Sequence, residues 1–285
     1  MYLLPRPQQE EWYEGYYALR YDGYIVLEET SGVDGYPYMK QLQEVVAQET
    51  GLRLKLRQGS SKKADITLRV DASAQAQAYT LTVNQKGIWL SAGDSAGLLY
   101  GIQTLRQIFR QKGACIPCLK ISDYPCFPVR GLFYDVTRGR IPTLEYLKKL
   151  ADRMVCYKMN QLQLYIEHSF LFENLSEVWR DDTPLTAEDI LEFDRYCKAR
   201  NIELVPAIAS FGHLYKVLRT KSFRRLCERP ELADAPFGFV DRMNHHTLDV
   251  SNAESLCFVK GLIKEYMALF SSDKFNICAD ETFDL

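Results

Sequence analysis

The amino-acid sequence predicts an α/β protein with two domains. Residues 1–127 mix short strand patterns with two helical patterns, whereas residues 128–285 alternate apolar strands with amphipathic helices. The two parts meet at Tyr124-Pro125-Cys126-Phe127-Pro128, where the prolines restrict the backbone and favour a stiff linker. A length of 285 residues also suits about two domains.

The first domain is expected to be a small α+β domain without catalytic residues. Its helices are predicted over residues 37–49, with Gly51 as C-cap, and 95–110. Asn84-Gln85-Lys86-Gly87 is typical of a hairpin turn between two strands. The predicted strands cover residues 24–28, 52–56, 66–70, 78–83 and 87–91. Because no His, Cys or acidic residues cluster here, a structural role is predicted.

The second domain is expected to contain a parallel sheet. Its strands are predicted over 132–136, 162–166, 202–209 and 275–279, and its first helix over 143–159. Capping boxes are predicted to open the two later helices, at Thr186-x-x-Asp189 and Ser251-x-x-Glu254. This alternation fits either a barrel or an open doubly wound sheet. No glycine-rich phosphate loop follows a strand, which disfavours a nucleotide-binding open sheet.

The ends of these four strands carry ionisable residues. Arg138 follows the first strand, Glu167 the second and His213 the third, and Asp280-Glu281 ends the fourth. Each residue alone could be a surface or loop residue. Together they lie at the strand ends where parallel α/β proteins form their active sites, so these five residues are the candidate site.

Composition and charge disfavour several function classes. The chain is 47% hydrophobic with a net charge of -2, and Lys221–Arg225 is only a local basic cluster, interpreted as a solvated helix face. A nucleic-acid partner is therefore not expected. No apolar run approaches the ~20 residues of a membrane span. Residues 1–6 are too short for the apolar core of a signal peptide. A cytoplasmic protein is expected.

Eight cysteines raise the question of a metal or redox site. Cys115-Ile116-Pro117-Cys118 is a CxxC pair with Cys126 close behind, but the four histidines lie far along the sequence. The pair is expected in a loop, whereas a thioredoxin-like pair opens a helix after a strand. Reduced thiols are therefore favoured, and no metal or cofactor is predicted. The role of these three cysteines remains open.

Several motifs are similar to those of a known family. Residues 130–138 (RGLFYDVTR) resemble an opening barrel strand, and Ala279-Asp280-Glu281 resembles a Gly-Asp-Glu catalytic pair. Further likeness lies in residues 157–160 (YKMN), in Phe211-Gly212-His213 and, within the first domain, in residues 97–105. In these motifs the chain resembles glycoside hydrolase family 20, the β-N-acetylhexosaminidases.

The resemblance implies a (β/α)8 TIM-type barrel, of which about four β/α units can be counted in residues 128–285. Because residue 285 closely follows the acidic pair, the chain is expected to be a fragment. Its fourth strand would then be an uncovered edge, through which two copies could pair as a homo-oligomer.

The resemblance also implies a carbohydrate substrate and a role for each candidate residue. Glu281 would be the general acid and then the base, and Asp280 would orient the substrate's 2-acetamido group, whose oxygen attacks the anomeric carbon. Arg138 would bind sugar hydroxyls, His213 would support that pocket, and Glu167 would replace the family's acidic residues after the second strand. Adjacent acids suit this substrate-assisted route better than one in which two carboxylates flank the sugar.

Two other functions remain open at this stage. The chain could come from another hydrolase of acetamido sugars, or from a non-catalytic carbohydrate-binding or assembly protein derived from the same fold. The residues do not distinguish N-acetylglucosamine from N-acetylgalactosamine, nor do they indicate the aglycone.

Overall fold

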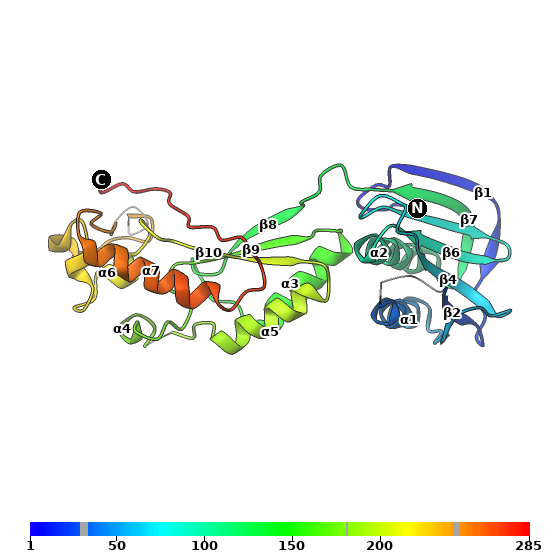
Figure 1. The fold of residues 1–285 in the computed structure, drawn as a ribbon, viewed down its shortest axis with the longest axis horizontal. Helices are drawn as coiled ribbons and strands as arrows, with labels where there is room; N and C mark the ends of the chain where they lie inside the picture. The colour runs from blue at the N-terminus through cyan, green and yellow to red at the C-terminus, as the bar shows by residue number, and fades with distance from the viewer. Residues whose placement is uncertain (29–33, 181, 242–245) are drawn as a thin grey trace. The chain divides into compact units, whose positions relative to one another are not determined.

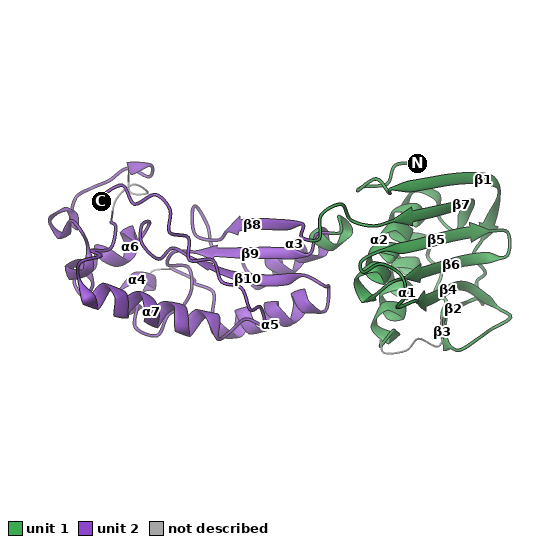
Figure 2. Cartoon of the chain, turned by 45° about the horizontal axis from the view of Figure 1, so that its top comes forward, with its two compact units in different colours: residues 1–128, 154–158 green, residues 129–153, 159–285 purple. Residues whose placement is uncertain are grey.

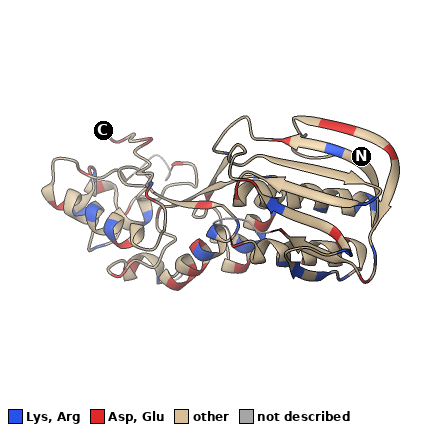
Figure 3. Cartoon of the chain, turned by 45° about the vertical axis from the view of Figure 1, so that its right-hand side comes forward, with Lys and Arg blue, Asp and Glu red and all other residues tan. Residues whose placement is uncertain are grey.

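The computed structural model describes residues 1–285 apart from 29–33, 181 and 242–245 (Figure 1). It contains two compact units, residues 1–128 with 154–158 and residues 129–153 with 159–285 (Figure 2). Basic and acidic residues are interspersed along the chain in both units (Figure 3). None of the helices in the described part is long and apolar enough to span a bilayer.

Unit 1 is built on a seven-stranded mixed sheet in the order β1-β7-β5-β6-β4-β2-β3. The strands β2, β3, β4 and β6 pair in parallel, while β5, β7 and β1 are added antiparallel. The strands are β1 (Gln9–Ala18), β2 (Tyr24–Leu27), β3 (Lys55–Gln58), β4 (Ala64–Val70), β5 (Tyr79–Asn84), β6 (Gly87–Ala92) and β7 (Cys115–Asp123).

Two helices, α1 (Tyr36–Thr50) and α2 (Ser95–Lys112), pack against this sheet and bury its apolar face. The predicted C-cap is confirmed, because Gly51 adopts φ 76° and donates its N–H to the Ala47 carbonyl. Asp94 caps the start of α2 by accepting the Gly97 N–H at 2.7 Å. The predicted hairpin is also confirmed, since β5 and β6 pair directly across Asn84 and Gly87.

Two expectations for this unit were wrong, and one strand was missed. The edge strand β1 was not predicted, and the CxxC pair begins strand β7 rather than lying in a loop. The strand expected over 52–56 begins three residues later, at Lys55. Lys55 is the first residue of β3 that pairs with β2, where it lies opposite Tyr24. Leu54 is fully buried without belonging to the ladder, which explains its strand-like pattern. All eight cysteines are free thiols.

Unit 2 contains a parallel sheet of β8 (Gly131–Asp135), β9 (Gln161–Ile166) and β10 (Glu203–Ile208), in the order β10-β9-β8. A long helix follows each strand, namely α3 (Leu144–Cys156), α5 (Ala187–Lys198) and α7 (Ala253–Met267). Shorter elements in the connections are α4 (Ser176–Trp179), α6 (Tyr215–Leu218), η1 (Arg224–Leu226) and η2 (Pro230–Leu232).

The predicted fourth strand is reduced to a single parallel bridge between Asn276 and Ala207 of β10. Two backbone hydrogen bonds hold it: Ile208 N–H donates to Asn276 O at 3.0 Å, and Asn276 N–H donates to Pro206 O at 2.9 Å. This order of strands is consistent with the start of a (β/α)8 barrel. Closure of the barrel, and pairing of two copies through its open edge, stay predictions.

The two predicted capping boxes have different outcomes. Thr186 accepts the Asp189 N–H while Asp189 accepts the Thr186 N–H, so this box is confirmed. The box at Ser251 was wrong, since Asn252 is the N-cap of α7 and accepts the Glu254 N–H at 3.0 Å. Ser251 instead donates its hydroxyl to Asp249 at 2.6 Å, within the turn before the helix.

Replacing Thr186 by Ala should destabilise the first turn of α5 by about 1 kcal/mol, because one helix-start N–H loses its acceptor. Amide exchange over α5 should then become roughly fivefold faster. Glu188→Ala is the matched control, since it alters the same turn without removing a cap contact. Equal exchange in both variants would contradict a stabilising role of the box.

Candidate functional site

The turn after β8 positions Arg138. The Asp135 carboxylate accepts the N–H groups of Thr137 at 2.9 Å and of Arg138 at 3.0 Å, which closes a tight turn at the strand end. The backbone ladder also runs one residue past the strand, since Val136 N–H donates to Tyr165 O. The backbone that carries Arg138 is therefore fixed by contacts from two strands.

Arg138, Tyr165 and Glu167 form one hydrogen-bonded group. Arg138 Nε donates to Glu167 Oε1 at 3.0 Å, and its Nη2 donates to Tyr165 Oη at 3.1 Å. Tyr165 in turn donates its hydroxyl to the same Glu167 oxygen at 3.1 Å. The sequence analysis did not single out Tyr165. The sequence could have indicated Tyr165, because it lies two residues before Glu167 and alternate residues of a strand point to the same face.

Glu167 is a buried carboxyl group with a perturbed acidity. Its burial raises the pKa of Glu167 above the ordinary value, although the nearby Arg138 guanidinium opposes this rise. Its backbone N–H donates to Thr137 Oγ1 at 3.0 Å, and Thr137 also shares a hydrogen bond with Ser169 at 2.7 Å. Glu167 is thus fixed in both its backbone and its side chain.

The turn after β10 brings His213 to the C-terminal segment. The imidazole is almost fully buried, and His213 adopts a left-handed φ of 60°. At the preceding Gly212, a Cβ would lie 2.8 Å from the carbonyl oxygen of Glu281. Only glycine permits this approach without a shift of the backbone. Gly212 therefore allows the segment to lie against the turn.

Asp280 and Glu281 are exposed acids that meet at His213. The His213 Nε2 atom lies 3.3 Å from Glu281 Oε2 and 3.9 Å from Asp280 Oδ2. Glu281 and Cys278 also adopt left-handed φ values, 51° and 42°. Such backbone strain is concentrated at functional sites in folded proteins. The bridge at Asn276 anchors the segment just before these residues.

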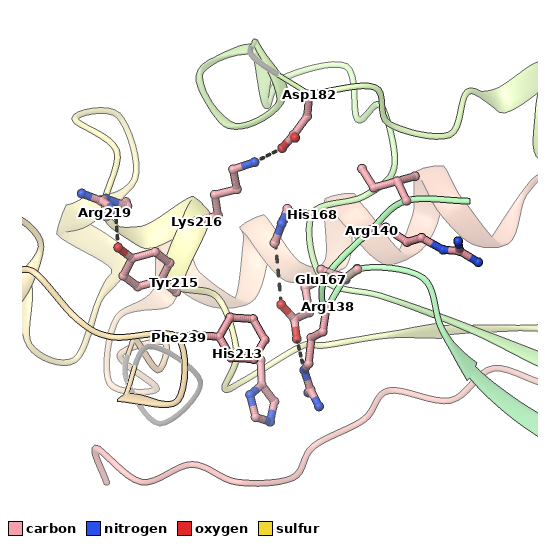
Figure 4. Close-up of a pocket in the computed structure, with 13 residues that line it drawn as sticks. Arg138, Arg140, Glu167, His168, Asp182, His213, Tyr215, Lys216, Arg219 and Phe239 are labelled. Atoms are coloured by element: carbon pink, nitrogen blue, oxygen red, sulfur yellow. Dashed lines mark hydrogen bonds and ion pairs between the residues drawn. The ribbon is translucent and has the colours of Figure 1, made fainter. Parts of the chain in front are cut away.

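The structure thus brings the five predicted site residues into two groups beside one pocket. His213, Asp280 and Glu281 form the first group, and Arg138 and Glu167 belong to the second. A pocket of about 350 Å³ is lined by Arg138, Glu167 and His213 (Figure 4). The two acids do not line it, but they contact His213, which does. The pocket is large enough for a single sugar ring.

The far wall of this pocket comes from a segment that the sequence analysis did not select. Tyr215 and Lys216 of α6, its C-cap Arg219 and the later Phe239 line it, opposite Arg138 and Arg140 (Figure 4). Lys216 forms an ion pair with Asp182. No motif marks these residues, because a short helix in a connection has no periodic signal.

One group of the described residues has metal-ligand donors close together. Donor atoms of His213, Asp280 and Glu281 lie within 4.8 Å of one another. The two carboxylates are more than half exposed, and acids of this kind also serve acid–base chemistry without a metal. The Cys115–Cys118 pair belongs to no such group among the described residues.

Comparisons with known proteins cover both units. Residues 1–124 match the model described as glycosyl hydrolase family 20, domain 2, and residues 127–284 match its catalytic domain. A β-hexosaminidase of Vibrio furnissii is 26% identical over 99% of this chain and 49% of its own length. One of Akkermansia muciniphila is 32% identical over 56% of this chain and 37% of its own length.

Solved structures show the same fold. The Streptomyces plicatus N-acetyl-β-hexosaminidase superposes with a TM-score of 0.81 and 22% identity, over 99% of this chain and 59% of that one. The chitobiase of Flavobacterium johnsoniae also gives 0.81, over 98% of this chain and 45% of that one. This chain therefore spans between 37% and 59% of the length of these four relatives. Since the two family models together cover nearly all of its residues, the chain belongs to glycosyl hydrolase family 20.

Proposed function

We propose that this chain supplies the acid–base pair of an enzyme that removes terminal β-linked N-acetylhexosamine from glycosides. The observation that carries the proposal is the contact of Glu281 with buried His213, beside a pocket lined by Arg138. The relatives named as β-hexosaminidases support the same reaction class. This chain spans only part of the length of those relatives. We therefore also propose that the chain itself catalyses the hydrolysis.

In the first step, the substrate's own acetamido group is the nucleophile. Glu281 donates its proton to the glycosidic oxygen as the bond to the anomeric carbon breaks. The acetamido oxygen bonds to that carbon from the opposite face, giving a cyclic oxazolinium ion. Asp280 accepts a hydrogen bond from the acetamido N–H and stabilises the positive charge that develops there.

In the second step, Glu281 acts as the base. Its carboxylate takes a proton from water, the water oxygen bonds to the anomeric carbon, and the ring of the intermediate opens to restore the acetamido group. The configuration at the anomeric carbon is retained. His213 Nε2 lies 3.3 Å from Glu281 Oε2 without a hydrogen bond between them, and a small rotation of the exposed Glu281 side chain would let the imidazole donate one while that residue is ionised.

The adjacency of the two acids supports this route over the two-carboxylate alternative. A retaining enzyme with a carboxylate nucleophile places its two acids about 5–5.5 Å apart on opposite sides of the scissile bond. Asp280 and Glu281 instead both approach the same histidine nitrogen, at 3.9 and 3.3 Å. That arrangement suits one acid at the leaving group and the other at the acetamido group.

Arg138 and Glu167 are proposed to bind the hydroxyl groups of the sugar. Arg138 offers N–H donors and Glu167 offers carboxylate oxygens, and both line the pocket next to His213. Their mutual bond and the bond of each to Tyr165 fix them before a substrate arrives. Such preorganisation lowers the cost of ordering on binding.

Replacing Glu281 by Gln should lower the hydrolysis of a chromogenic N-acetyl-β-glucosaminide by on the order of 10²–10⁴-fold, since the proton donor is lost. Asp273→Asn is the matched control, because this exposed acid of the same segment lies outside the site. Unchanged turnover in the Gln variant would contradict the mechanism. Binding of N-acetylglucosamine without any turnover would instead favour a non-catalytic carbohydrate-binding protein.

The variant Gly212→Ala should lower kcat while leaving the protein folded. The added Cβ would lie 2.8 Å from Glu281 O and 3.2 Å from Asp280 O, so the acidic segment must move away from His213. We expect a loss of about 10²-fold, as follows from a displacement of ~1 Å at a catalytic group. Gly261→Ala in α7 meets no atom within 4 Å and should leave kcat unchanged. Equal kcat in both variants would show that the close approach is unimportant.

The raised pKa of Glu167 gives a pH dependence of stability. Because the folded-state pKa lies above the ordinary value of 4.5, this residue's contribution is fully present below pH 4.5. It is lost as pH rises through the folded-state pKa. Glu167→Gln should therefore gain stability relative to the parent chain between pH 4.5 and 7, measured by urea unfolding. A constant difference across this range would contradict the raised pKa.

A further inference from the structure

A short strip of backbone, residues 246–248, lies against the turn after β10. Leu248 donates its N–H to the carbonyl oxygen of Phe211 at 2.9 Å, and Leu214 donates its N–H to the carbonyl oxygen of His246 at 3.3 Å. These two bonds bracket the buried imidazole of that turn in the sequence. The strip therefore holds the turn at both of its ends.

The strip is itself a fixed part of unit 2. All three of its residues are buried. Leu248 forms an antiparallel bridge with Cys227, and the N–H of Glu228 donates to the carbonyl oxygen of Thr247 at 2.9 Å. A group that is bonded to the strip is therefore held at a defined place relative to the turn.

The basic cluster Lys221–Arg225 leads the chain to this bridge. The sequence analysis interpreted the cluster as a solvated helix face, which was wrong. Lys221 lies in a turn and Arg224 begins η1, whose C-cap is the bridged Cys227. The cluster therefore forms a turn that returns the chain to the strip.

The C-terminal segment is bonded to the strip through one carboxylate. Thr247 donates its N–H to Asp284 Oδ2 at 3.1 Å. A buried amide requires an acceptor, and an ionised carboxylate accepts more strongly than a neutral oxygen does. Because Asp284 lies three residues after Glu281, this bond fastens the segment just beyond the acid.

The acidic pair is thus held between two anchors. One anchor is the bridge at Asn276, and the other is the bond of Asp284 to the strip. Between them Cys278 and Glu281 adopt left-handed φ values of 42° and 51°. Such values persist in residues other than glycine only where the surrounding structure enforces them. If either anchor is released, the segment can relax and carry the acid away from the buried imidazole.

We propose that Asp284 is a positioning residue that holds Glu281 against His213. This inference rests on the proposed function, because Glu281 is the proton donor of that reaction. The carboxylate of Asp284 binds a backbone N–H, so it acts on the reaction through Glu281. Since the same strip also fixes the turn of His213, one hydrogen bond helps to set the distance between the acid and the imidazole.

The variants Asp284→Ala and Asp284→Asn test this role on the full chain. Asn keeps a side-chain oxygen that can accept the Thr247 N–H, whereas Ala removes the acceptor. We expect Ala to lower kcat for a chromogenic N-acetyl-β-glucosaminide about tenfold, as the loss of one hydrogen bond to a charged group provides. KM should change less than about threefold, because the residues proposed to bind the sugar are untouched. The Asn variant should keep kcat within about threefold of the parent value.

Asp273→Ala is the matched control, since this exposed acid precedes the bridge at Asn276. It should leave kcat and KM unchanged. A kcat for Asp284→Ala equal to that of the parent chain, or an equal loss in the Ala and Asn variants, would overturn the inference. If the Ala variant does not fold, Asp284→Glu tests the same bond, because the added methylene group displaces the carboxylate. It should then lower kcat where Asn does not.

A second measurement, by NMR, does not depend on turnover. The ring resonances of His213, assigned by their loss in His213→Gln, should shift on Glu281→Gln, because the two side chains lie 3.3 Å apart. In the Asp284→Ala background this response should be lost. The same response in that background, or no response in either, would contradict the positioning role. A response that depends on Asp284, with turnover absent or unaffected by Glu281→Gln, would leave this inference standing and refute the proposed function instead.

Discussion

The candidate site depends on the attachment of the C-terminal segment to β10. Two backbone hydrogen bonds at Asn276 extend the parallel sheet by a single bridge, and Gly212 then lets the backbone of residues 280 and 281 lie against the next turn. Without that bridge the two acids would belong to an exposed tail. With it, they meet a buried imidazole whose position is fixed by the sheet itself. Backbone pairing thus organises side chains that are themselves largely solvent-exposed.

The strand ends and their ionisable residues could be predicted from the sequence because continuous apolar strands and helical periodicity are strong local signals. The three parallel strands of unit 2 lie within one residue of their predicted bounds. The fourth was overestimated because Phe275-Asn276-Ile277 has a strand-like pattern, yet only Asn276 pairs. An apolar pattern indicates that a segment is buried. A β-strand also requires backbone hydrogen bonds in register with a neighbouring strand. The same distinction explains Leu54, which is buried beside β3 without pairing in it.

The contacts within the site could not be predicted in the same way. The sequence indicates that Arg138 and Glu167 follow neighbouring strands, but not that Tyr165 joins them through a shared carboxylate oxygen. Nor does it indicate that α6 closes the pocket, because Tyr215, Lys216 and Arg219 lie in a connection whose path is set by tertiary packing. Leu214 and Leu218 supply that packing by joining a small apolar cluster with Leu226 and Leu248.

The two sides of the pocket differ in how their charges are compensated, and this difference has a consequence for recognition. On the strand side, Arg138 is bonded to Glu167, so the pair is close to neutral and presents donors and acceptors alike. On the helix side, Arg219 is held by an aromatic ring that leaves its charge intact. Arg219 is exposed, so water also solvates its charge, while the neighbouring Lys216 is paired with Asp182. The two walls therefore offer a ligand different partners: hydrogen-bond donors and acceptors on the strand side, and the exposed guanidinium of Arg219 on the helix side.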